Sequence, residues 1–486
     1  YDGAYYQKVH HHAYTEDMAF VNNGWYGFSM GVALAWDALE DLAKIDFDAL
    51  GFADGTRESM LNQQKVLVAS LYLDGLDLFG GVPLYTTTQS DIKGRSTDLE
   101  TFNFIDSLLT EAIPELPLKE ELGAQETGSI NRAAAAALKV RLYFNAKSYI
   151  GKDMFAEAAG ICKDIIDGKY GQYALASDWT NIFGFDNEAC PELIWSIPSQ
   201  NAKLETDAGY WDWSVPYNYK NYLGGLEGSG SNNGIGLIPS LDPTGKKYPY
   251  KLGGAYGKFH DRDVRKQPYV YEGSGKYRGM FIVGKLVNPI HPEWTCTGSR
   301  EYKGEVITVV DQVAYFAKVG KDAKYPDLES LPSNVGMAEE NSCVRLVKFS
   351  PRPNQDEMKR KFDPDVPVIR LAEIYYTLAE CKMRAGDKEG AADLINTVRK
   401  RYFEGGNDPD PVTSANLDKY RMLDEWQLEF LGEGRRRTDL VRWDAYVTES
   451  WWDHQATNNK NLNRFPIHYS IIGANNLIKQ NPGYGE

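Results

Sequence analysis

Two stretches far apart in the chain repeat one plan: a long helix, a turn at a glycine and a shorter helix. In residues 130–173, apolar side chains recur at helical spacing up to Gly151, whose left-handed conformation would end the first helix. In residues 368–402, Gly386 takes the same place, and Asp387 can cap the helix that follows. Each plan takes about 34 residues, the length of a tetratricopeptide-type helical hairpin. The sequence therefore predicts a scaffold of helical hairpins.

The rest of the N-terminal part is also helical in pattern, whereas the middle of the chain is not. Residues 22–43 and 57–80 carry apolar side chains at helical spacing. From about residue 178 to 367 this period is weak, and Gly, Pro, Asn and Tyr dominate. Within that range, the alternating segments 307–310 and 343–349 predict short strands.

We therefore expect a mainly α-helical fold, with residues 1–486 forming a single domain. The helical scaffold would occupy approximately residues 20–175 and 365–450, and a C-terminal tail would follow over 451–486. A loop-rich insertion with short strands would occupy approximately residues 178–365. Loops of such length are uncommon unless they bind something, so we expect the insertion to face a ligand.

The composition argues against several classes of protein. A net charge of −15 disfavours a nucleic-acid binder, which needs a basic face to replace counterions. No apolar run reaches the roughly 18 residues that a membrane-spanning helix needs. Five cysteines without a CxxC pair disfavour a disulfide framework or a zinc ribbon. The 31 Tyr and 11 Trp instead indicate flat, amphipathic contact surfaces.

One segment, residues 423–446, concentrates charge and raises the question of catalysis. Glu425 and Glu429 would lie one turn apart on one face of a helix. The two carboxylates of a glycosidase face each other across a sugar at about 5–10 Å and usually come from different elements. Arg435 and the two arginines after it follow the expected helix end and could fold back on the glutamates. We therefore favour structural ion pairing over acid/base chemistry here.

Two segments could be considered as metal sites. The run His10–His12 lies close to Glu16 and Asp17, but three consecutive side chains cannot easily converge on one ion, so we expect a solvated loop. Residues 260–263 offer oxygen ligands that suit Ca²⁺, yet the spacing of an EF-hand is missing and a plain turn is favoured. We expect no cofactor, with a structural calcium ion as the weaker alternative.

Aromatic loops are the candidate binding surfaces. A sugar ring has an apolar C–H face edged with hydroxyls, which a Trp or Tyr ring can cover while neighbouring polar side chains bond the hydroxyls. For each single aromatic residue the alternative is burial in the core. The candidates are Trp211, Trp213, Tyr217, Asn218 and Tyr219 in one loop, Trp25 and Tyr26 near the N-terminus, and Tyr271 and Trp294 in the insertion.

Four motifs resemble those of one known family. They are DLFGGVPL (77–84), RLAEIYYTLAECKMRAGDKEGAADLINTVRKR (370–401), LDEWQLEFLGEGRRRTDLVRW (423–443) and FPIHYSIIGANNLIKQNPGY (465–484). In kind and order they are similar to the SusD/RagB family, surface glycan-binding lipoproteins of starch-utilisation-type systems in Gram-negative bacteria. The chain departs from the family pattern at Trp426, where the family often has Arg, and at His468, where it has Pro.

The resemblance implies a scaffold of four degenerate tetratricopeptide-like hairpins and a non-catalytic role in capturing a glycan at the cell surface. It also implies a TonB-dependent outer-membrane transporter of the SusC type as partner, and a lipid anchor upstream of Tyr1, since no cysteine lies near that end. Nucleic acid is not an expected partner. The residues assigned to a structural ion-pair network are Arg370, Glu373, Glu380, Glu425, Glu429, Arg435 and Asp439.

Two other functions remain open at this point. An α-helical glycoside hydrolase or lyase would need two inward carboxylates from different elements, and Asp212 with Glu227 is the pair to consider. A peptide-binding module is the second alternative, because tetratricopeptide hairpins often bind peptides in their concave face.

Overall fold

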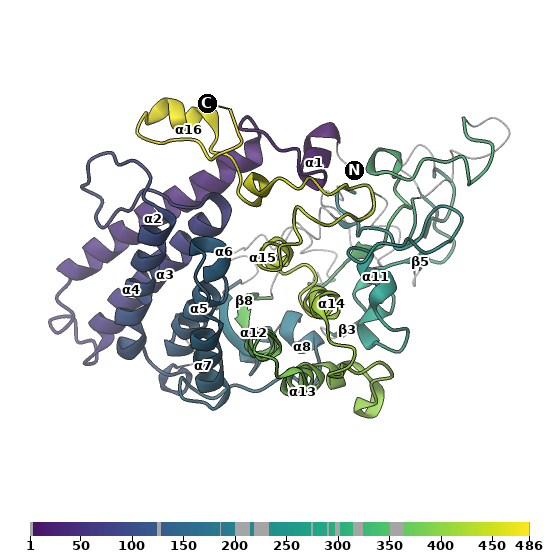
Figure 1. The fold of residues 1–486 in the computed structure, drawn as a ribbon. Coiled ribbons are helices and arrows are strands. Elements are labelled where there is room, and N and C mark those ends of the chain that lie inside the picture. The colour runs from purple at the N-terminus through teal and green to yellow at the C-terminus, as the bar shows by residue number, and fades with distance from the viewer. Residues whose placement is uncertain are drawn as a thin grey trace.

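Long helices build the two ends of the chain, and short strands and loops lie between them in sequence (Figure 1). The computed structural model describes residues 3–123, 128–184, 186–199, 214–217, 233–273, 276–288, 291–296, 302–313, 324–349 and 364–485. The predicted mainly α-helical class is confirmed. No helix in these ranges is both long enough and apolar enough to cross a lipid bilayer.

The α-helices differ widely in length. They are α1 (Gly3–His10), α2 (Ala19–Lys44), α3 (Thr56–Phe79), α4 (Asp98–Ala112), α5 (Arg132–Phe144), α6 (Ala146–Ile150), α7 (Phe155–Ile166), α8 (Thr180–Phe183), α11 (Ala255–Lys258), α12 (Leu371–Arg384), α13 (Lys388–Arg399), α14 (Lys419–Glu429), α15 (Arg436–Arg442) and α16 (Tyr469–Ala474). Short 3-10 helices are η1 (Ile113–Glu115), η2 (Lys119–Glu121), η3 (Asn187–Ala189), η4 (Val264–Lys266), η5 (Val335–Met337), η6 (Lys400–Tyr402), η7 (Glu404–Gly406) and η8 (Lys460–Asn463).

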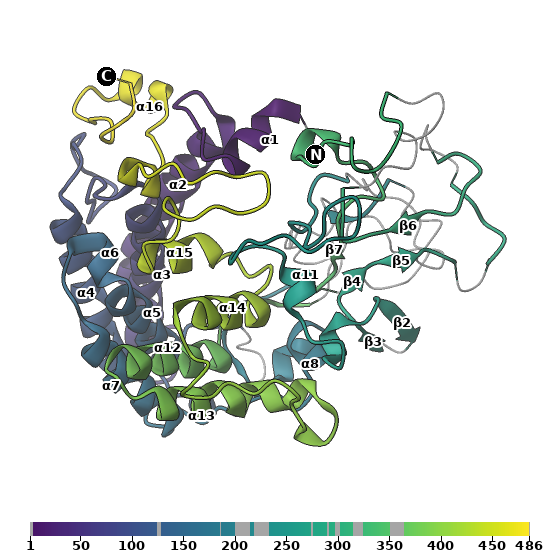
Figure 2. The ribbon, with the colours of Figure 1, turned by 45° about the vertical axis from the view of Figure 1, so that its right-hand side comes forward.

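The helices pack in the order in which the chain forms them. Helix α3 packs between α2 and α4, α5 packs on α4 and α7, and α12 packs on both α7 and α13. Figures 1 and 2 show the N-terminal helices on one side, the helices α12–α15 in the middle and the strand-bearing loops on the other side. The alanines from Ala133 to Ala137 on α5 are at most 1% exposed. Such small side chains let neighbouring helices approach α5 all round its axis.

The two predicted hairpins are present, with one difference. The first predicted helix is divided into α5 and α6 at Asn145, whose side-chain amide donates to the carbonyl oxygen of Arg141 at 2.9 Å. Gly151 has the predicted left-handed conformation, with φ 72°. In the second hairpin, Asp387 caps α13 by accepting a hydrogen bond from the Gly390 N–H at 2.9 Å. The Asn145 side chain thus bonds to the backbone of the preceding turn and interrupts the helix, whereas the apolar spacing predicted one continuous helix.

The strands form two-stranded antiparallel pairs. They are β1 (Leu193–Ile197) with β8 (Val366–Arg370), β2 (Val270–Gly273) with β3 (Lys276–Arg278), β4 (Phe281–Ile282) with β7 (Arg345–Leu346), and β5 (Gly284–Lys285) with β6 (Thr308–Val309). Strands β6 and β7 lie within the segments 307–310 and 343–349 that were predicted to be strands. Strand β8 runs directly into α12, so the β1–β8 pair fixes where that helix begins.

Arg370, at the junction of β8 and α12, is the centre of a buried ion-pair network. Its side chain is 1% exposed. Its guanidinium pairs with Glu429 at 2.6 Å, with Glu433 at 2.8 Å and with Glu192 at 3.1 Å. Glu429 also pairs with Arg401 at 2.8 Å. The network therefore joins β8 to the end of α14 and to the segment that precedes β1.

A second group of buried charges joins α12 to α15. Glu380 pairs with Arg442 at 2.8 Å and with Arg384 at 2.8 Å. Burial alone would raise the pKa of Glu380, but the two guanidinium groups outweigh it and lower the pKa to about 2. Trp426, which departs from the family pattern, donates its indole N–H to the same carboxylate at 2.7 Å.

The arginines after α14 do not fold back on Glu425 and Glu429, contrary to the expectation. Gly432 and Gly434 have positive φ angles and turn the chain before α15 begins. This turn carries the arginines to other carboxylates. Arg435 pairs with Glu373 at 2.6 Å and with Asp439 at 3.4 Å. The other pairs of the assigned residues are Glu373 with Arg141 (2.7 Å), Glu425 with Arg399 (2.8 Å) and Arg421 (2.9 Å), and Asp439 with Arg442 (2.8 Å).

We expect Arg442→Met to lower the free energy of unfolding by about 3–5 kcal/mol, because it leaves two buried carboxylates without this partner. Urea denaturation measures the loss. Arg278→Met is the matched control: Arg278 pairs with Glu272 at 3.0 Å, but the two side chains are 49% and 48% exposed. Such an exposed pair contributes less than about 1 kcal/mol. Equal losses in the two variants would contradict the assigned role of the buried network.

The same network predicts sensitivity to acid. Burial alone would raise the pKa of Glu373, but Arg141 and Arg435 lower it to about 2. Glu373 and Glu380 therefore have similar pKa values. The unfolded chain then binds more protons between pH 4.5 and 2, so stability present above pH 4.5 is lost as the pH falls towards 2. Urea titrations across this window should show the loss, and Glu380→Gln should make it smaller. A free energy of unfolding that stays constant over the window would refute this prediction.

Candidate functional site

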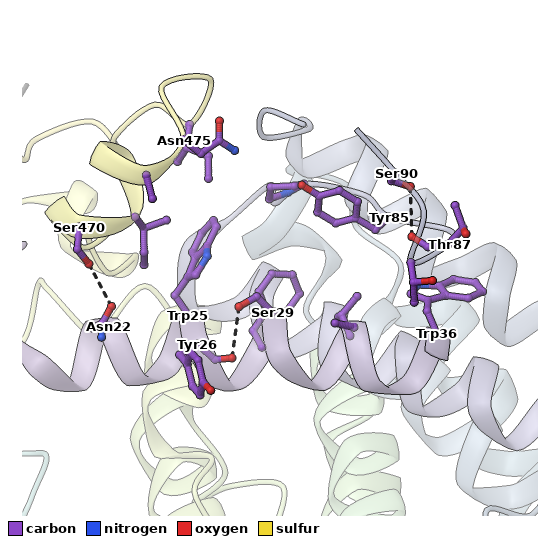
Figure 3. Close-up of a pocket in the computed structure, with 18 residues that line it drawn as sticks. Asn22, Trp25, Tyr26, Ser29, Trp36, Tyr85, Thr87, Ser90, Ser470 and Asn475 are labelled. Carbon is purple, nitrogen blue, oxygen red and sulfur yellow. Dashed lines mark hydrogen bonds between the residues drawn. The ribbon is translucent and has the colours of Figure 1, made fainter. Parts of the chain in front are cut away.

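A groove with a volume of about 580 Å³ lies between α2, the segment 83–90 and α16 (Figure 3). Helix α2 provides its floor, the segment that follows α3 provides one wall, and the C-terminal helix α16 provides the other. The groove is therefore closed by parts of the chain that are nearly four hundred residues apart in sequence.

The floor follows from the spacing of side chains along α2. Trp25, Ser29 and Trp36 recur at helical intervals and line the groove. Phe28 packs behind them against α3, where Gly75 leaves room: a Cβ at Gly75 would lie 3.1 Å from the Phe28 ring. This close approach fixes the position of α2, and so of the groove floor, relative to α3.

Aromatic side chains line both ends of the groove, and they differ in how much of each ring is exposed. Figure 3 shows Trp25 rising from α2 towards α16, with Tyr85 and Trp36 at the other end. Trp25 is 6% exposed and Trp36 is 8% exposed, so each offers only part of its ring, whereas Tyr26 at the edge is 59% exposed. The indole N–H of Trp36 is buried and has no hydrogen-bond partner among the described residues.

The polar rim is held in place by hydrogen bonds. Glu40 on α2 accepts from the backbone N–H of Thr88 at 2.8 Å and from its hydroxyl at 2.6 Å, and also from the Thr87 hydroxyl. The hydrogen bond from the Thr87 hydroxyl has the largest effect, and together these bonds lower the pKa of Glu40 to about 2. The carboxylate therefore stays ionised. On the opposite wall, the Ser470 hydroxyl donates to the Asn22 side chain at 3.5 Å (Figure 3).

Within the described part of the chain, the lining contains aromatic, aliphatic, hydroxyl and amide groups but no charged side chain. The lining residues are Asn22, Trp25, Tyr26, Phe28, Ser29, Val32, Ala33, Trp36, Pro83, Tyr85, Thr87, Thr88, Ser90, Ser470, Ile471, Ala474, Asn475 and Ile478. Such a site can bind an uncharged ligand through ring contacts and hydrogen bonds. It offers neither a general acid nor a nucleophilic carboxylate of its own.

Of the predicted binding residues that it describes, the structure brings only two into the groove. Trp25 and Tyr26 come together in the groove. Tyr217 is 55% exposed, and Trp294 is 39% exposed and stacks on His291 with ring centroids 4.2 Å apart. Tyr271 belongs to β2. Trp211, Trp213, Asn218 and Tyr219, and the alternative pair Asp212 and Glu227, lie outside the described residues.

Sequence reasoning missed Trp36, Tyr85 and the threonines of the rim. Trp36 lies three turns after Trp25 on α2, so the helical spacing of tryptophans could have indicated it. Tyr85 and Thr87 directly follow the DLFGGVPL motif, which was used only as a mark of the family. No local signal indicates that α16 forms the opposite wall of the groove, because that arrangement brings together the two ends of the chain.

The expectation of a solvated loop at His10–His12 is wrong. Helix α1 extends to His10, and His12 is 5% exposed. The His12 ring stacks on Tyr446 with centroids 3.9 Å apart. A partner more than four hundred residues away buries the segment, which the neighbouring sequence cannot show. Residues 260–263 form the predicted turn, in which the Asp263 N–H donates to the carbonyl oxygen of His260 at 2.9 Å.

Comparison with known proteins places the chain among relatives of one kind. The starch-binding protein SusD of Bacteroides thetaiotaomicron is 26% identical over 445 residues, which are 89% of this chain and 74% of that protein. A SusD superfamily protein from Parabacteroides distasonis has a TM-score of 0.69 at 17% identity, covering 99% of this chain and 89% of that one. Surface glycan-binding protein A from Bacteroides uniformis has a TM-score of 0.65 at 18% identity, covering 98% and 88%.

A family model settles the relationship. The model SusD_RagB, described as the SusD family, matches residues 191–484. The matched range takes in three of the four motifs and makes up more than half of the chain. The protein therefore belongs to the SusD family.

Proposed function

We propose that this protein binds a glycan without cleaving it, and that the groove between α2, the segment 83–90 and α16 is a binding site. The observation that carries the proposal is the uncharged aromatic groove on a chain of the SusD family. Of the proteins to which the chain is similar, one is named a starch-binding protein and another a surface glycan-binding protein.

The groove has both parts that a sugar needs. Trp25, Tyr26 and Tyr85 present ring surfaces for the apolar C–H faces, and amide and hydroxyl groups along the rim can bond the sugar hydroxyls.

The absence of charge indicates the class of glycan. Among the residues that the structure describes, no Asp, Glu, Lys or Arg lines the groove, so a uronate, sulfate or sialate group would lose its hydration without gaining a counter-charge. The chain as a whole carries a net charge of −15, which also repels a polyanion. We therefore propose a neutral oligosaccharide or polysaccharide as the ligand.

The hydrolase alternative has less support. Glu425 and Glu429 are buried in ion pairs with arginines and lie outside the groove. Glu40, the carboxylate beside the groove, accepts hydrogen bonds from the rim and is not among the lining residues. A glycosidase needs two carboxylates across the sugar, one of them able to give up a proton.

We also propose that the protein works at the outer-membrane surface, lipid-anchored in its full-length form, and delivers its glycan to a TonB-dependent transporter of the SusC type. Family membership supports this setting. Co-purification with the transporter from outer membranes tests it directly.

Blocking the groove tests the site. Ala33 is an exposed residue of α2 that lines the groove, so Ala33→Trp should fill it and abolish retardation in native affinity gels that contain the bound polysaccharide. Leu34→Trp is the matched control, because Leu34 is the next residue, is 61% exposed and does not line the groove. We expect Tyr26→Ala to weaken binding roughly 3- to 10-fold, the effect of losing one aromatic contact.

The outcomes separate the site from the function. If Ala33→Trp binds like the wild type, the groove is not the site, and Trp211→Ala with Trp213→Ala test the loop that was predicted from sequence. Retardation by no polysaccharide would overturn glycan binding itself. Release of reducing sugar would show an enzyme.

The charge argument predicts selectivity. We expect neutral polysaccharides such as starch, laminarin or xyloglucan to retard the protein, and polygalacturonate and chondroitin sulfate to have no effect at low ionic strength. Low ionic strength makes the expected difference largest, because charge repulsion is then least screened. Stronger retardation by an anionic polymer than by every neutral one would show that the ligand class is wrong.

A further inference from the structure

Four of the seven histidines in the chain meet at one place. His10 is the last residue of α1, His11 and His12 follow it directly, and His454 comes from the turn 451–454. The ring centroids of His12 and His454 are 4.2 Å apart, and those of His10 and His11 are 5.0 Å apart. This cluster lies apart from the groove, and none of its residues lines the groove.

The turn 451–454 places a carboxylate against two of these rings. Asp453 Oδ2 lies 3.3 Å from His11 Nε2, and the Asp453 carbonyl oxygen lies 3.1 Å from His10 Nε2. One ligand atom from each of His10, His11 and Asp453 lies within 4.8 Å of the others. Asp453 reaches this position with φ 54°, a left-handed conformation that costs energy in a non-glycine residue and is concentrated at functional sites.

We propose that His10, His11 and Asp453 form a site for a first-row transition-metal ion of the Zn²⁺ type. Two imidazole nitrogens and one carboxylate oxygen are ligands that suit this class, whereas Ca²⁺ and Mg²⁺ prefer oxygen alone. Two ligands of a tetrahedral zinc ion with bonds of about 2.0–2.1 Å lie about 3.3 Å apart. That matches the 3.3 Å between His11 Nε2 and Asp453 Oδ2.

The surroundings support a built site. The backbone N–H of Val335, the first residue of η5, donates to Asp453 Oδ2 at 2.7 Å and so orients the carboxylate. His454 Nδ1 lies 2.9 Å from the carbonyl oxygen of His10, which ties the end of α1 to the turn. The His11 side chain is 39% exposed, so its ring has room to turn towards an ion and water can complete the coordination.

A bound ion would connect three segments that are distant in sequence: α1, η5 and the turn 451–454. Metal binding would then stabilise the folded chain, because the unfolded chain does not hold these ligands together. All five cysteines are buried, so they do not compete for the ion in the folded protein. The inference does not depend on glycan binding.

The test is zinc binding by the full chain, purified without a histidine tag and freed of metal with a chelator. Isothermal titration with ZnCl₂ should give one site with a micromolar or lower Kd, and the melting temperature should rise with Zn²⁺ but not with Mg²⁺ or Ca²⁺. His11→Gln and Asp453→Asn should each weaken binding at least 10-fold. Asn tolerates the left-handed conformation at position 453, and the metal-free melting temperature shows that each variant folds.

His291→Gln is the matched control. His291 Nδ1 also lies 3.3 Å from the Glu293 carboxylate. Among the described residues, however, this pair has no third potential metal ligand close enough to form a group like that of His10, His11 and Asp453. This variant should bind zinc like the wild type. Absence of zinc binding by the wild type, or equal affinity in the wild type and both site variants, would overturn the proposal.

Discussion

Charged groups from separate parts of the chain meet at one buried carboxylate, Glu429 at the end of α14. Arg370 reaches it from β8, Arg401 from η6 and Arg265 from η4, at 2.6, 2.8 and 3.4 Å. Lys348, which follows β7, donates to the Glu429 carbonyl oxygen at 3.2 Å. A buried charge without its partners is strongly destabilising, so this arrangement forms only when all these segments are in place. It fixes the loop-rich middle of the chain against the helices.

The groove depends on a second set of contacts, which bind the C-terminal segment to the N-terminal helices. Arg95 donates to the Lys479 carbonyl oxygen at 2.9 Å, and Asn481 donates to the Phe79 carbonyl oxygen at 3.0 Å. Arg437 pairs with Asp77 at 2.7 Å at the end of α3. These bonds place α16 over α2 (Figure 1). Because both walls are anchored to the same helices, the groove is preformed, and little ordering of the chain would oppose binding.

Local patterns were enough to predict the helices, but not the contacts between distant segments. Apolar spacing and the glycines at 151 and 386 predicted both hairpins, and the ion pairing expected of Glu425 and Glu429 is present in the structure. The partners of those glutamates were not predictable, since Arg399 and Arg401 belong to another motif. The groove and the histidine cluster each need one segment from either end of the chain, and no period in the sequence relates those ends.

The distribution of charge distinguishes the scaffold from the site. Buried arginines and carboxylates pair with one another within the scaffold, as Arg370 and Arg442 do, whereas the groove lining within the described part of the chain has no charged side chain. A neutral sugar can then be held only by ring contacts and hydrogen bonds, each worth about 1 kcal/mol.

One groove of about 580 Å³ covers a short stretch of a polysaccharide, so its own affinity must be modest. A polymer that repeats the same unit offers many equivalent stretches close to the groove, and this raises the effective concentration without any further contact. Weak individual contacts also let the glycan leave, as the proposed delivery to a transporter requires.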